Sequence, residues 1–424
     1  MPIAGLGQPQ TPSQSQSQTP SQSQSQSQSN ADNDMQKINQ ISSTLKNMNS
    51  TPQQPQVQQQ QQQQQAKQED GEKPLFEFDR YFMSWLNEVK TGILVSSYKT
   101  GHVFSFGLAN IPNQGTKMSM YLSSFNRPMG IHIDKEVAYV ASSGNLWKYQ
   151  NIGSVESQDL GKFDANYIPK WVMFSNDVDA HDLTVDKNGQ VYFVSSHFSC
   201  ICIPSHDFSF KAFWKPPWIS KIAAEDRCHL NGMCARDGEV RYVTAVSQTD
   251  IRGGWRENRI GKGVVYDIKE DKVICSGLTM AHSPRWFNNK LWLLEAGTGW
   301  FGYVTDEGRF ERKTFIPGFA RGVSFVNERY AIVGCSQDRH ESVFQGLPIG
   351  EALKKNNVEA KCAVYVIDLQ NFDIIHNILF KSPIDELYDV VAIPGFSRPK
   401  LSDPTDDKGM REYKLDLSLI EGNQ

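Results

Sequence analysis

The chain has 424 residues and a formal net charge of −4, from 43 Lys and Arg against 47 Asp and Glu. This slightly acidic balance, without a basic cluster, argues against a nucleic-acid partner and against an anionic membrane surface, since both need clustered Lys and Arg. No apolar run approaches the roughly 20 residues needed to span a bilayer, so we expect no membrane association.

Residues 1–72 form a segment of low complexity. Ser and Gln alternate from Ser13 to Ser29, an unbroken polyglutamine run extends from Gln58 to Gln65, and no aromatic residue occurs. Such a composition offers too little apolar area to offset the entropy of ordering the backbone. We therefore predict a disordered Ser/Gln-rich tail over residues 1–72. A tail of this kind either mediates self-association or partner binding, or is a tolerated expansion without a specific role.

The cysteines indicate the compartment. There are seven, an odd number without a repeated pair spacing, and the amino terminus carries no charged-then-apolar leader. Both features favour a reducing environment over a secreted, disulfide-bonded one. We expect an intracellular, cytoplasmic and soluble protein.

From Pro74 onward the sequence has the composition of a globular domain. A short helix is expected at residues 78–89, and apolar residues then alternate with polar ones at strand length, interrupted by Gly, Asn and Asp turns. The first hairpin combines residues 92–98 with 102–106. Five similar pairs follow at residues 130–134 with 137–141, 183–186 with 191–195, 232–235 with 240–243, 284–287 with 291–295, and 322–325 with 330–333. A last strand, residues 388–392, has no hairpin after it.

These copies share a pattern that begins with a polar or special residue and a small residue, followed by alternating apolar residues and a tight turn. The first position is occupied by Met129, His181, Asn231, His282, Arg321 and Tyr388. Six copies, 39 to 67 residues apart, predict an all-β fold, a six-bladed β-propeller over residues 73–400. The hairpin at 92–106 lacks an inner strand and the strand at 388–392 lacks a hairpin. We therefore predict that the C-terminal strand closes the first blade, which removes exposed sheet edges.

Two further points concern the C-terminal segment and the alternative folds. Residues 401–424 are expected to form a C-terminal extension that packs on the propeller or is partly mobile. A β-sandwich or two small barrels would also produce short strands at regular spacing. The sixfold recurrence and the split terminal blade favour the propeller over both.

Three histidines are the leading functional signal. In a propeller the inner strands line one channel, so residues at the first pattern position converge at its mouth. A gapless overlay puts Asn231 in line with His181 and His282, and His229 lies two residues earlier. We predict that His181, His229, His282 and Asn231 form a divalent-metal site. Imidazoles alone suit Zn²⁺ or Fe²⁺, while a set with Asn and a carboxylate suits Mn²⁺ or Ca²⁺. The alternative is that these polar residues only meet the water of the channel.

Other polar residues are expected at the same mouth. The predicted catalytic residues are Arg321 and Arg285, whose guanidinium groups suit a substrate carboxylate or phosphate, and Glu386, with Asp389 beside it. Two long loops, residues 247–258 and 336–346, open there, and long loops on a rigid scaffold usually carry function. They supply the predicted substrate-binding residues Trp255, Arg256, Asn258 and Arg339.

These residues predict a metal-dependent hydrolase or lyase acting on a small anionic or carbonyl-bearing substrate, with the metal activating water or polarising a carbonyl. The alternative is a non-enzymatic module whose rim, formed by the loops of Trp255, Arg256 and Phe344, binds a peptide or protein partner. A third hypothesis makes the propeller a scaffold and places any interaction in the Gln-rich tail.

The chain resembles an uncharacterised, mostly bacterial family of conserved hypothetical proteins expected to be β-propellers. The resemblance covers about residues 82–399 and rests on six strings: Ser84-Trp-Leu86, Arg127-Pro-Met-Gly130, Glu225-Asp-Arg-Cys-His-Leu-Asn-Gly232, Gly253-Gly-Trp-Arg-Glu-Asn258, His282-Ser-Pro-Arg-Trp286 and Pro317-Gly-Phe-Ala-Arg-Gly322. It implies the fold and no reaction. In architecture alone the chain is similar to the six-bladed peptidyl amidating lyases and gluconolactonase-like hydrolases, and it matches no motif of either.

Overall fold

The computed structural model describes residues 74–157, 161–337, 345–407 and 409–415. The chain divides into two units, Met1–Lys73 and Pro74–Gln424, and every described residue belongs to the second. The tail predicted to be disordered, residues 1–72, lies outside the described residues.

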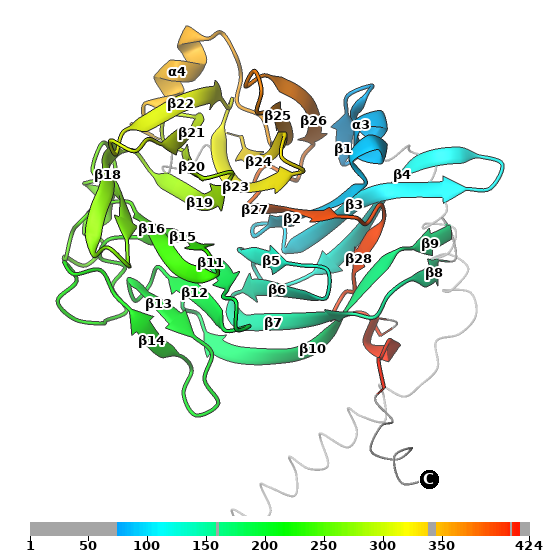
Figure 1. The fold of residues 1–424 in the computed structure, drawn as a ribbon, viewed down its shortest axis with the longest axis horizontal. Helices are drawn as coiled ribbons and strands as arrows, with labels where there is room; N and C mark the ends of the chain where they lie inside the picture. The colour runs from blue at the N-terminus through cyan, green and yellow to red at the C-terminus, as the bar shows by residue number, and fades with distance from the viewer. Residues whose placement is uncertain (1–73, 158–160, 338–344, 408, 416–424) are drawn as a thin grey trace, which may run out of the picture. The chain divides into compact units, whose positions relative to one another are not determined.

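The strands form six small sheets around a central channel, which confirms the six-bladed propeller (Figure 1). From the channel outward, blade 1 consists of β27 (Asp389–Pro394), β2 (Thr91–Ser97), β3 (His102–Ile111) and β4 (Gly115–Ser124). Blade 2 consists of β5 (Ile131–Ile133), β6 (Val137–Ser142), β7 (Gly144–Asn151), β10 (Ala165–Asn176) and β28 (Pro399–Leu401). Blade 3 consists of β11 (Ala180–Val185), β12 (Val191–Ser195), β13 (Cys200–Ile203) and β14 (Lys211–Trp214).

The second half of the ring follows the same plan. Blade 4 consists of β15 (Leu230–Arg236), β16 (Glu239–Ala245), β17 (Gly263–Asp267) and β18 (Lys272–Leu278). Blade 5 consists of β19 (Ala281–Phe287), β20 (Lys290–Glu295), β21 (Trp300–Val304) and β22 (Phe310–Phe315). Blade 6 consists of β23 (Phe319–Val326), β24 (Tyr330–Ser336), β25 (Ala363–Asp368), β26 (Ile374–Phe380) and β1 (Phe76–Phe78). A separate hairpin pairs β8 (Val155–Ser157) with β9 (Gly161–Phe163).

Both chain ends tie the ring together. The C-terminal strand β27 pairs antiparallel with β2, from Thr91 opposite Pro394 to Ser96 opposite Asp389, which confirms the predicted closure of the first blade. Beyond it, β28 adds a parallel strand to β10 in blade 2, and β28 ends at Leu401, one residue past the expected end of the propeller. The N-terminal strand β1 adds to β26 in blade 6. Three adjacent blades, 6, 1 and 2, are therefore joined by strands from the two ends (Figure 1).

Few helices interrupt the strands. Helix α3 (Phe82–Val89) buries an apolar stripe, Phe82, Trp85, Leu86 and Val89, at helical spacing. It begins later than the expected residue 78 because Phe76–Phe78 form β1. The other helical segments are α4 (Ile349–Lys355), the 3₁₀ turn η1 (Gly254–Arg256) and η2 (Gly409–Arg411). None of the helices in the described ranges is long and apolar enough to cross a membrane.

The second pattern position alternates around the channel between glycine and a side-chain acceptor. From blade 2 to blade 6 and on to blade 1 it reads Gly130, Asp182, Gly232, Ser283, Gly322 and Asp389. Each acceptor takes a backbone N–H of the next blade: Asp182 Oδ2 from Met233 at 3.1 Å, Ser283 Oγ from Gly322 at 2.9 Å, and Asp389 Oδ2 from Ile131 at 2.9 Å.

The glycines of this alternation are required by close approach. A Cβ atom on Gly232 would lie 2.5 Å from Pro284, and one on Gly322 would lie 2.4 Å from the backbone nitrogen of Val390. In both places the inner strand of the next blade occupies the space that a side chain would need. The alternation joins all six inner strands at the level of the channel mouth, and thereby holds the residues described below.

Candidate functional site

Strand pairing shows which residue of blade 4 faces the channel. Ala180 pairs with Ser195, Leu230 with Ala245, and Ala281 with Glu295 at corresponding places in blades 3, 4 and 5. The residues that follow are His181, Asn231 and His282, so Asn231 is the structural equivalent of the two histidines. The strand register shifts at or just after this residue in each of the three inner strands, and such irregularities commonly redirect side chains beside active sites.

His229 occupies a different position, equivalent to Asp179 and Met280. These three residues have left-handed backbones, with φ of 48°, 53° and 55° in that order. Each carbonyl accepts a backbone N–H from just beyond the second strand of its blade, at 3.1–3.2 Å. Non-glycine residues of this conformation are strained and cluster at functional sites.

A small cavity lies at the convergence. Its lining consists of His181, Asp182, Asn231, His282, Ser283, Arg285, Arg321, Tyr388 and Asp389, and its volume of about 10 Å³ accommodates roughly one water molecule. The structure thus brings together five of the predicted site residues: His181, Asn231, His282, Arg285 and Arg321. Asp182 and Ser283 were missed by the sequence analysis. The signal that could have identified them is the alternation of Gly with Asp or Ser at the second pattern position.

His282 is engaged through both ring nitrogens. Its Nδ1 lies 2.9 Å from the carbonyl oxygen of Met280, which only accepts, so Nδ1 carries the proton. Its Nε2 therefore accepts from Nδ2 of Asn231 at 3.0 Å. Burial, followed by the charge of Arg321, holds the pKa of His282 well below its usual range. His282 is a neutral imidazole whose hydrogen bonds are satisfied within the protein.

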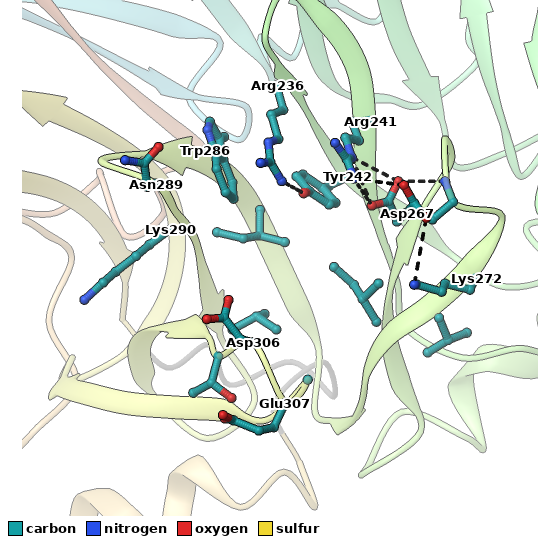
Figure 2. A pocket seen from close by; sticks show the side chains of 17 residues that line it. Arg236, Arg241, Tyr242, Asp267, Lys272, Trp286, Asn289, Lys290, Asp306 and Glu307 are labelled. Atoms are coloured by element: carbon teal, nitrogen blue, oxygen red, sulfur yellow. Dashed lines mark hydrogen bonds and ion pairs between the residues drawn. The ribbon is translucent and has the colours of Figure 1, made fainter.

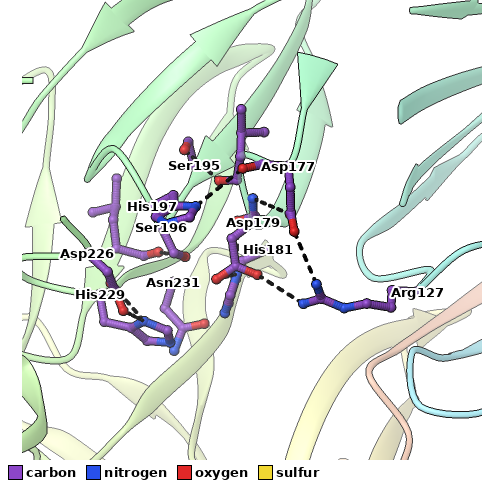
Figure 3. Close-up of polar contacts among 12 residues, drawn as sticks. Arg127, Asp177, Asp179, His181, Ser195, Ser196, His197, Asp226, His229 and Asn231 are labelled. Atoms are coloured by element: carbon purple, nitrogen blue, oxygen red, sulfur yellow. Dashed lines mark hydrogen bonds and ion pairs between the residues drawn. The ribbon is translucent and has the colours of Figure 1, made fainter. Parts of the chain in front are cut away.

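His181 and His229 are held differently (Figure 3). Nδ1 of His181 donates to the backbone oxygen of Asp179 at 3.0 Å, and burial lowers the His181 pKa. Nδ1 of His229 lies 3.1 and 3.2 Å from the two carboxylate oxygens of Asp226. The two rings meet edge to face with centroids 4.8 Å apart. No hydrogen bond to Nε2 of either ring is formed by the described residues.

Asp226 is itself fixed by the loop that was predicted to bind substrate. The indole Nε1 of Trp255 donates to Asp226 Oδ2 at 2.6 Å, and Arg256 Nη2 lies 3.9 Å from the same oxygen. Trp255 also stacks on the His229 ring with centroids 4.2 Å apart. Burial acts to raise the pKa of Asp226, but the hydrogen bonds from His229 and Trp255 outweigh it and the pKa is lowered. Asp226 is therefore a carboxylate that orients His229.

Arg321 lies at the cavity without an ion-pair partner among the described residues. Its guanidinium faces the rings of Phe319 at 4.8 Å, Tyr388 at 5.2 Å and Tyr98 at 6.0 Å. Its Nε is buried and has no hydrogen-bond acceptor in the described parts of the chain. Arg321 is thus a half-buried cation that the described residues do not neutralise at ion-pair distance.

Arg285 is fully used by the protein. Its side chain, 20% exposed, pairs with Asp182 at 2.9 Å and approaches Asp389 at 3.8 Å. Its Nη1 also donates to the carbonyls of Pro284 at 2.9 Å and Met233 at 3.3 Å. Arg285 comes from blade 5 and its two carboxylates from blades 3 and 1, so this triad connects alternate blades across the channel. Its contacts are those of a structural cation.

Burial raises the pKa of Asp389 to about 7, against the lowering effect of Arg285. Since the folded pKa lies above the ordinary 3.8, the contribution of this proton to stability is complete below about pH 4 and is lost as the pH rises through about 7. We expect the unfolding free energy of the natural protein, relative to Asp389→Asn, to fall over that range. Urea unfolding of both chains at several pH values measures it, and parallel curves would contradict the assignment. The lowered pKa values of His181 and His282 make stability rise with pH, which is the opposite dependence. They are present in both the natural protein and Asp389→Asn, so the comparison of the two proteins removes their effect.

The remaining predicted residues lie elsewhere. Glu386 is buried beside blade 1, where Oε2 accepts the backbone N–H of Lys99 at 3.1 Å, and it does not line the cavity. Asn258 donates to the Gly254 carbonyl within its own loop at 2.9 Å. Two predicted residues lie outside the described residues: Arg339 and Phe344. In the described ranges, no group of three or more His, Cys, Asp or Glu residues is arranged to hold a metal ion.

A larger groove of about 430 Å³ lies between blades 4 and 5, at the strand ends opposite the channel mouth (Figure 2). Arg236 lies over the Trp286 ring at 3.9 Å and donates to the Tyr242 hydroxyl at 2.8 Å. Arg241 pairs with Asp267 at 2.9 Å. The groove lining includes no histidine or cysteine, so its size does not make it the better candidate for chemistry.

The fold and the mouth define a six-bladed β-propeller with a buried, histidine-rich polar cluster at one end of its channel. Residues 80–401 match the family described as "Domain of unknown function (DUF4915)", and the chain belongs to this family. No curated protein matches the sequence.

Several solved propeller structures are similar to the chain. A streptogramin B lyase is 12% identical, with a TM-score of 0.37, over 76% of this chain and 95% of the lyase. A gluconolactonase from Xanthomonas campestris is 10% identical, with a TM-score of 0.38, over 69% of this chain and 86% of that enzyme. A virginiamycin B lyase from Staphylococcus aureus is 12% identical, with a TM-score of 0.34, over 72% of this chain and 100% of the lyase. At these values the likenesses concern the fold and carry no argument about the site.

Proposed function

We propose that the protein is an enzyme, a hydrolase or lyase, whose active site is the channel mouth and whose acid–base groups are His181 and His229. The observation that supports this is the contact between two buried imidazoles, each oriented through Nδ1 by an acidic residue and each with Nε2 available. Two proton-transfer groups side by side serve reactions in which one proton is removed while another is delivered.

The two rings have different roles in this proposal. Neutral His181 donates its Nδ1 proton to the Asp179 carbonyl, so its Nε2 lone pair accepts a proton from substrate or water. His229 is paired through Nδ1 with the Asp226 carboxylate, which orients the ring, and we assign it the delivery of a proton from Nε2 to the leaving group. A carbonyl-bearing or anionic substrate is attracted to the mouth by Arg321.

A divalent metal ion, Zn, Fe, Mn or Ca, remains part of the proposal, with fewer protein ligands than the sequence predicted. The predicted set of four ligands does not fit as a set, because His282 and Asn231 are hydrogen-bonded to each other. Nε2 of His181 and Nε2 of His229 are the predicted donors that a metal would still find available. Such an ion would supply a Lewis acid or an activated water. Elemental analysis of the purified full chain tests this directly.

The experiment is a turnover screen with small lactones, aryl esters and carboxylates that carry a β-leaving group. For a substrate that is converted, His181→Gln and His229→Gln are expected to lower kcat by about 10² to 10⁴ because each removes a proton-transfer group. Asp226→Asn should lower kcat less and shift the pH profile, since it leaves the ring in place. His206→Gln, at an exposed loop position, is the matched control. Unchanged kcat in both ring variants, with near-ultraviolet circular dichroism intact, would refute the proposal.

The non-enzymatic alternative has one observation in its favour. Ile251 and Ile260, in the same loop as Trp255, are 71% and 49% exposed, and exposed apolar side chains beside an aromatic residue suit a peptide or protein partner. A stoichiometric partner that is lost on Ile251→Asp and retained in His229→Gln would favour a binding module over the enzyme.

A further inference from the structure

Arg321 shows what kind of ligand the mouth accepts. It begins the channel-facing part of β23, and no described residue forms an ion pair or hydrogen bond with its guanidinium. Partly buried arginines are normally paired, because desolvating a cation without a counter-charge is costly. An unpaired one at a cavity therefore indicates that the counter-charge is supplied by a ligand.

The charged groups around Arg321 do not supply its counter-charge. His181 and His282 are neutral, since burial lowers both pKa values. The carboxylates of Asp182 and Asp389 also line the cavity, but both lie toward Arg285, at 2.9 and 3.8 Å. The pair of carboxylates thus has its own cation, and Arg321 remains one positive charge that is not balanced within ion-pair distance by the described residues.

The surroundings of Arg321 favour a carboxylate over a phosphate. A single guanidinium offers two parallel N–H donors that match one carboxylate, whereas a dianionic phosphate calls for additional cations. Arg285, the other arginine that lines the cavity, is already paired. The rings of Phe319, Tyr388 and Tyr98 surround Arg321, and Phe319 and Tyr388 are buried. The apolar surface for the rest of the ligand is therefore on the Trp255 loop, where Ile251 is exposed.

We propose that Arg321 is the anion-binding residue of the channel mouth and that the ligand is a small monocarboxylate with an apolar or aromatic body. The cavity has room for about one water molecule, so at most one carboxylate oxygen enters it. The body of the ligand then lies outward, toward the Trp255 loop. This inference rests on the proposed function only in making the ligand a substrate, because the binding itself depends on Arg321 and not on the imidazoles.

The test is calorimetric titration of the full chain with sodium phenylacetate, phenylacetamide and phenyl phosphate. We expect phenylacetate to bind. The neutral amide and the phosphate should bind at least about tenfold more weakly, because neither matches one guanidinium as a monoanionic carboxylate does. Arg321→Met should abolish phenylacetate binding, and Arg321→Lys should weaken it about tenfold, since lysine keeps the charge but not the paired donors. Arg309→Met, which removes an arginine that is 80% exposed in blade 5, is the control and should leave binding unchanged.

Three results would overturn the assignment: equal affinity for acid and amide, tighter binding of phenyl phosphate, or unchanged phenylacetate affinity in Arg321→Met. Thermal unfolding of each variant verifies that it is folded, and Arg321→Met breaks no ion pair in the described residues. Two readouts separate the two proposals: turnover in His229→Gln tests the acid–base function, and phenylacetate binding in Arg321→Met tests the carboxylate site. Normal turnover in His229→Gln together with lost binding in Arg321→Met would refute the acid–base function and uphold the carboxylate site. Lost turnover in His229→Gln together with unchanged phenylacetate binding in Arg321→Met would support the acid–base function and refute the carboxylate site.

Discussion

Arg285→Met is expected to lower the unfolding free energy by about 3–5 kcal/mol, the usual effect of removing one partner from a buried ion pair. Methionine fills a similar volume, so the loss is one of charge and hydrogen bonds more than of packing. The substitution leaves Asp182 and Asp389 in the channel without a cation. It also removes the donors to the Pro284 and Met233 carbonyls.

Urea unfolding at pH 7, followed by tryptophan fluorescence, measures this effect. Arg309→Met serves as the control for loss of an exposed arginine and should change stability by no more than about 0.5 kcal/mol. Adding Asp182→Asn and Asp389→Asn to Arg285→Met should recover part of the loss, because neither side chain can then carry a negative charge. A change below about 1 kcal/mol in the single variant would show that the triad does not have the structural role given to it.

A chain that ends at Leu387 is expected to lose cooperative unfolding altogether. It lacks β27, so β2 loses its inner partner over the whole register from Thr91 to Ser96, and blade 1 no longer reaches the channel. The Asp389 acceptor for blade 2 is lost with it. Because domains are stable by only about 5–15 kcal/mol, an open ring with an unpaired edge should not remain folded.

Complementation in trans makes this expectation sharper. A synthetic peptide of residues 386–415 carries both β27 and β28, and adding it to the truncated chain should restore the circular dichroism spectrum and a cooperative thermal transition. A scrambled peptide of the same composition is the control. A truncated chain that unfolds cooperatively without the peptide would contradict the view that closure by β27 maintains the ring.

The architecture could be predicted because its signals are local. Each hairpin has its own alternation and turn, and the unmatched strand at residues 388–392 indicated the closure that the pairing of β27 with β2 confirms. The short strands β1 and β28 were not anticipated. They are three residues long, and their positions depend on which outer strand lies nearby.

The site was predicted less completely, because its details arise only after the ring closes. A two-residue shift keeps a side chain on the same face of a strand, so alternation could not separate His229 from Asn231. The left-handed backbone of His229 separates them in the structure. The pairing of Arg285 with Asp182 joins residues 103 positions apart, and no local pattern indicates it.

The alternation of glycine with an acceptor makes the repeating unit of this ring two blades, not one. Insertion or deletion of a single blade would bring two glycines or two acceptors side by side, leaving either a gap or a crowded junction at the channel. Addition or loss of a pair would preserve every junction. A ring of another size with the same junctions would therefore need an even number of blades, and boundaries between pairs are the natural places to open the chain in a circular permutation.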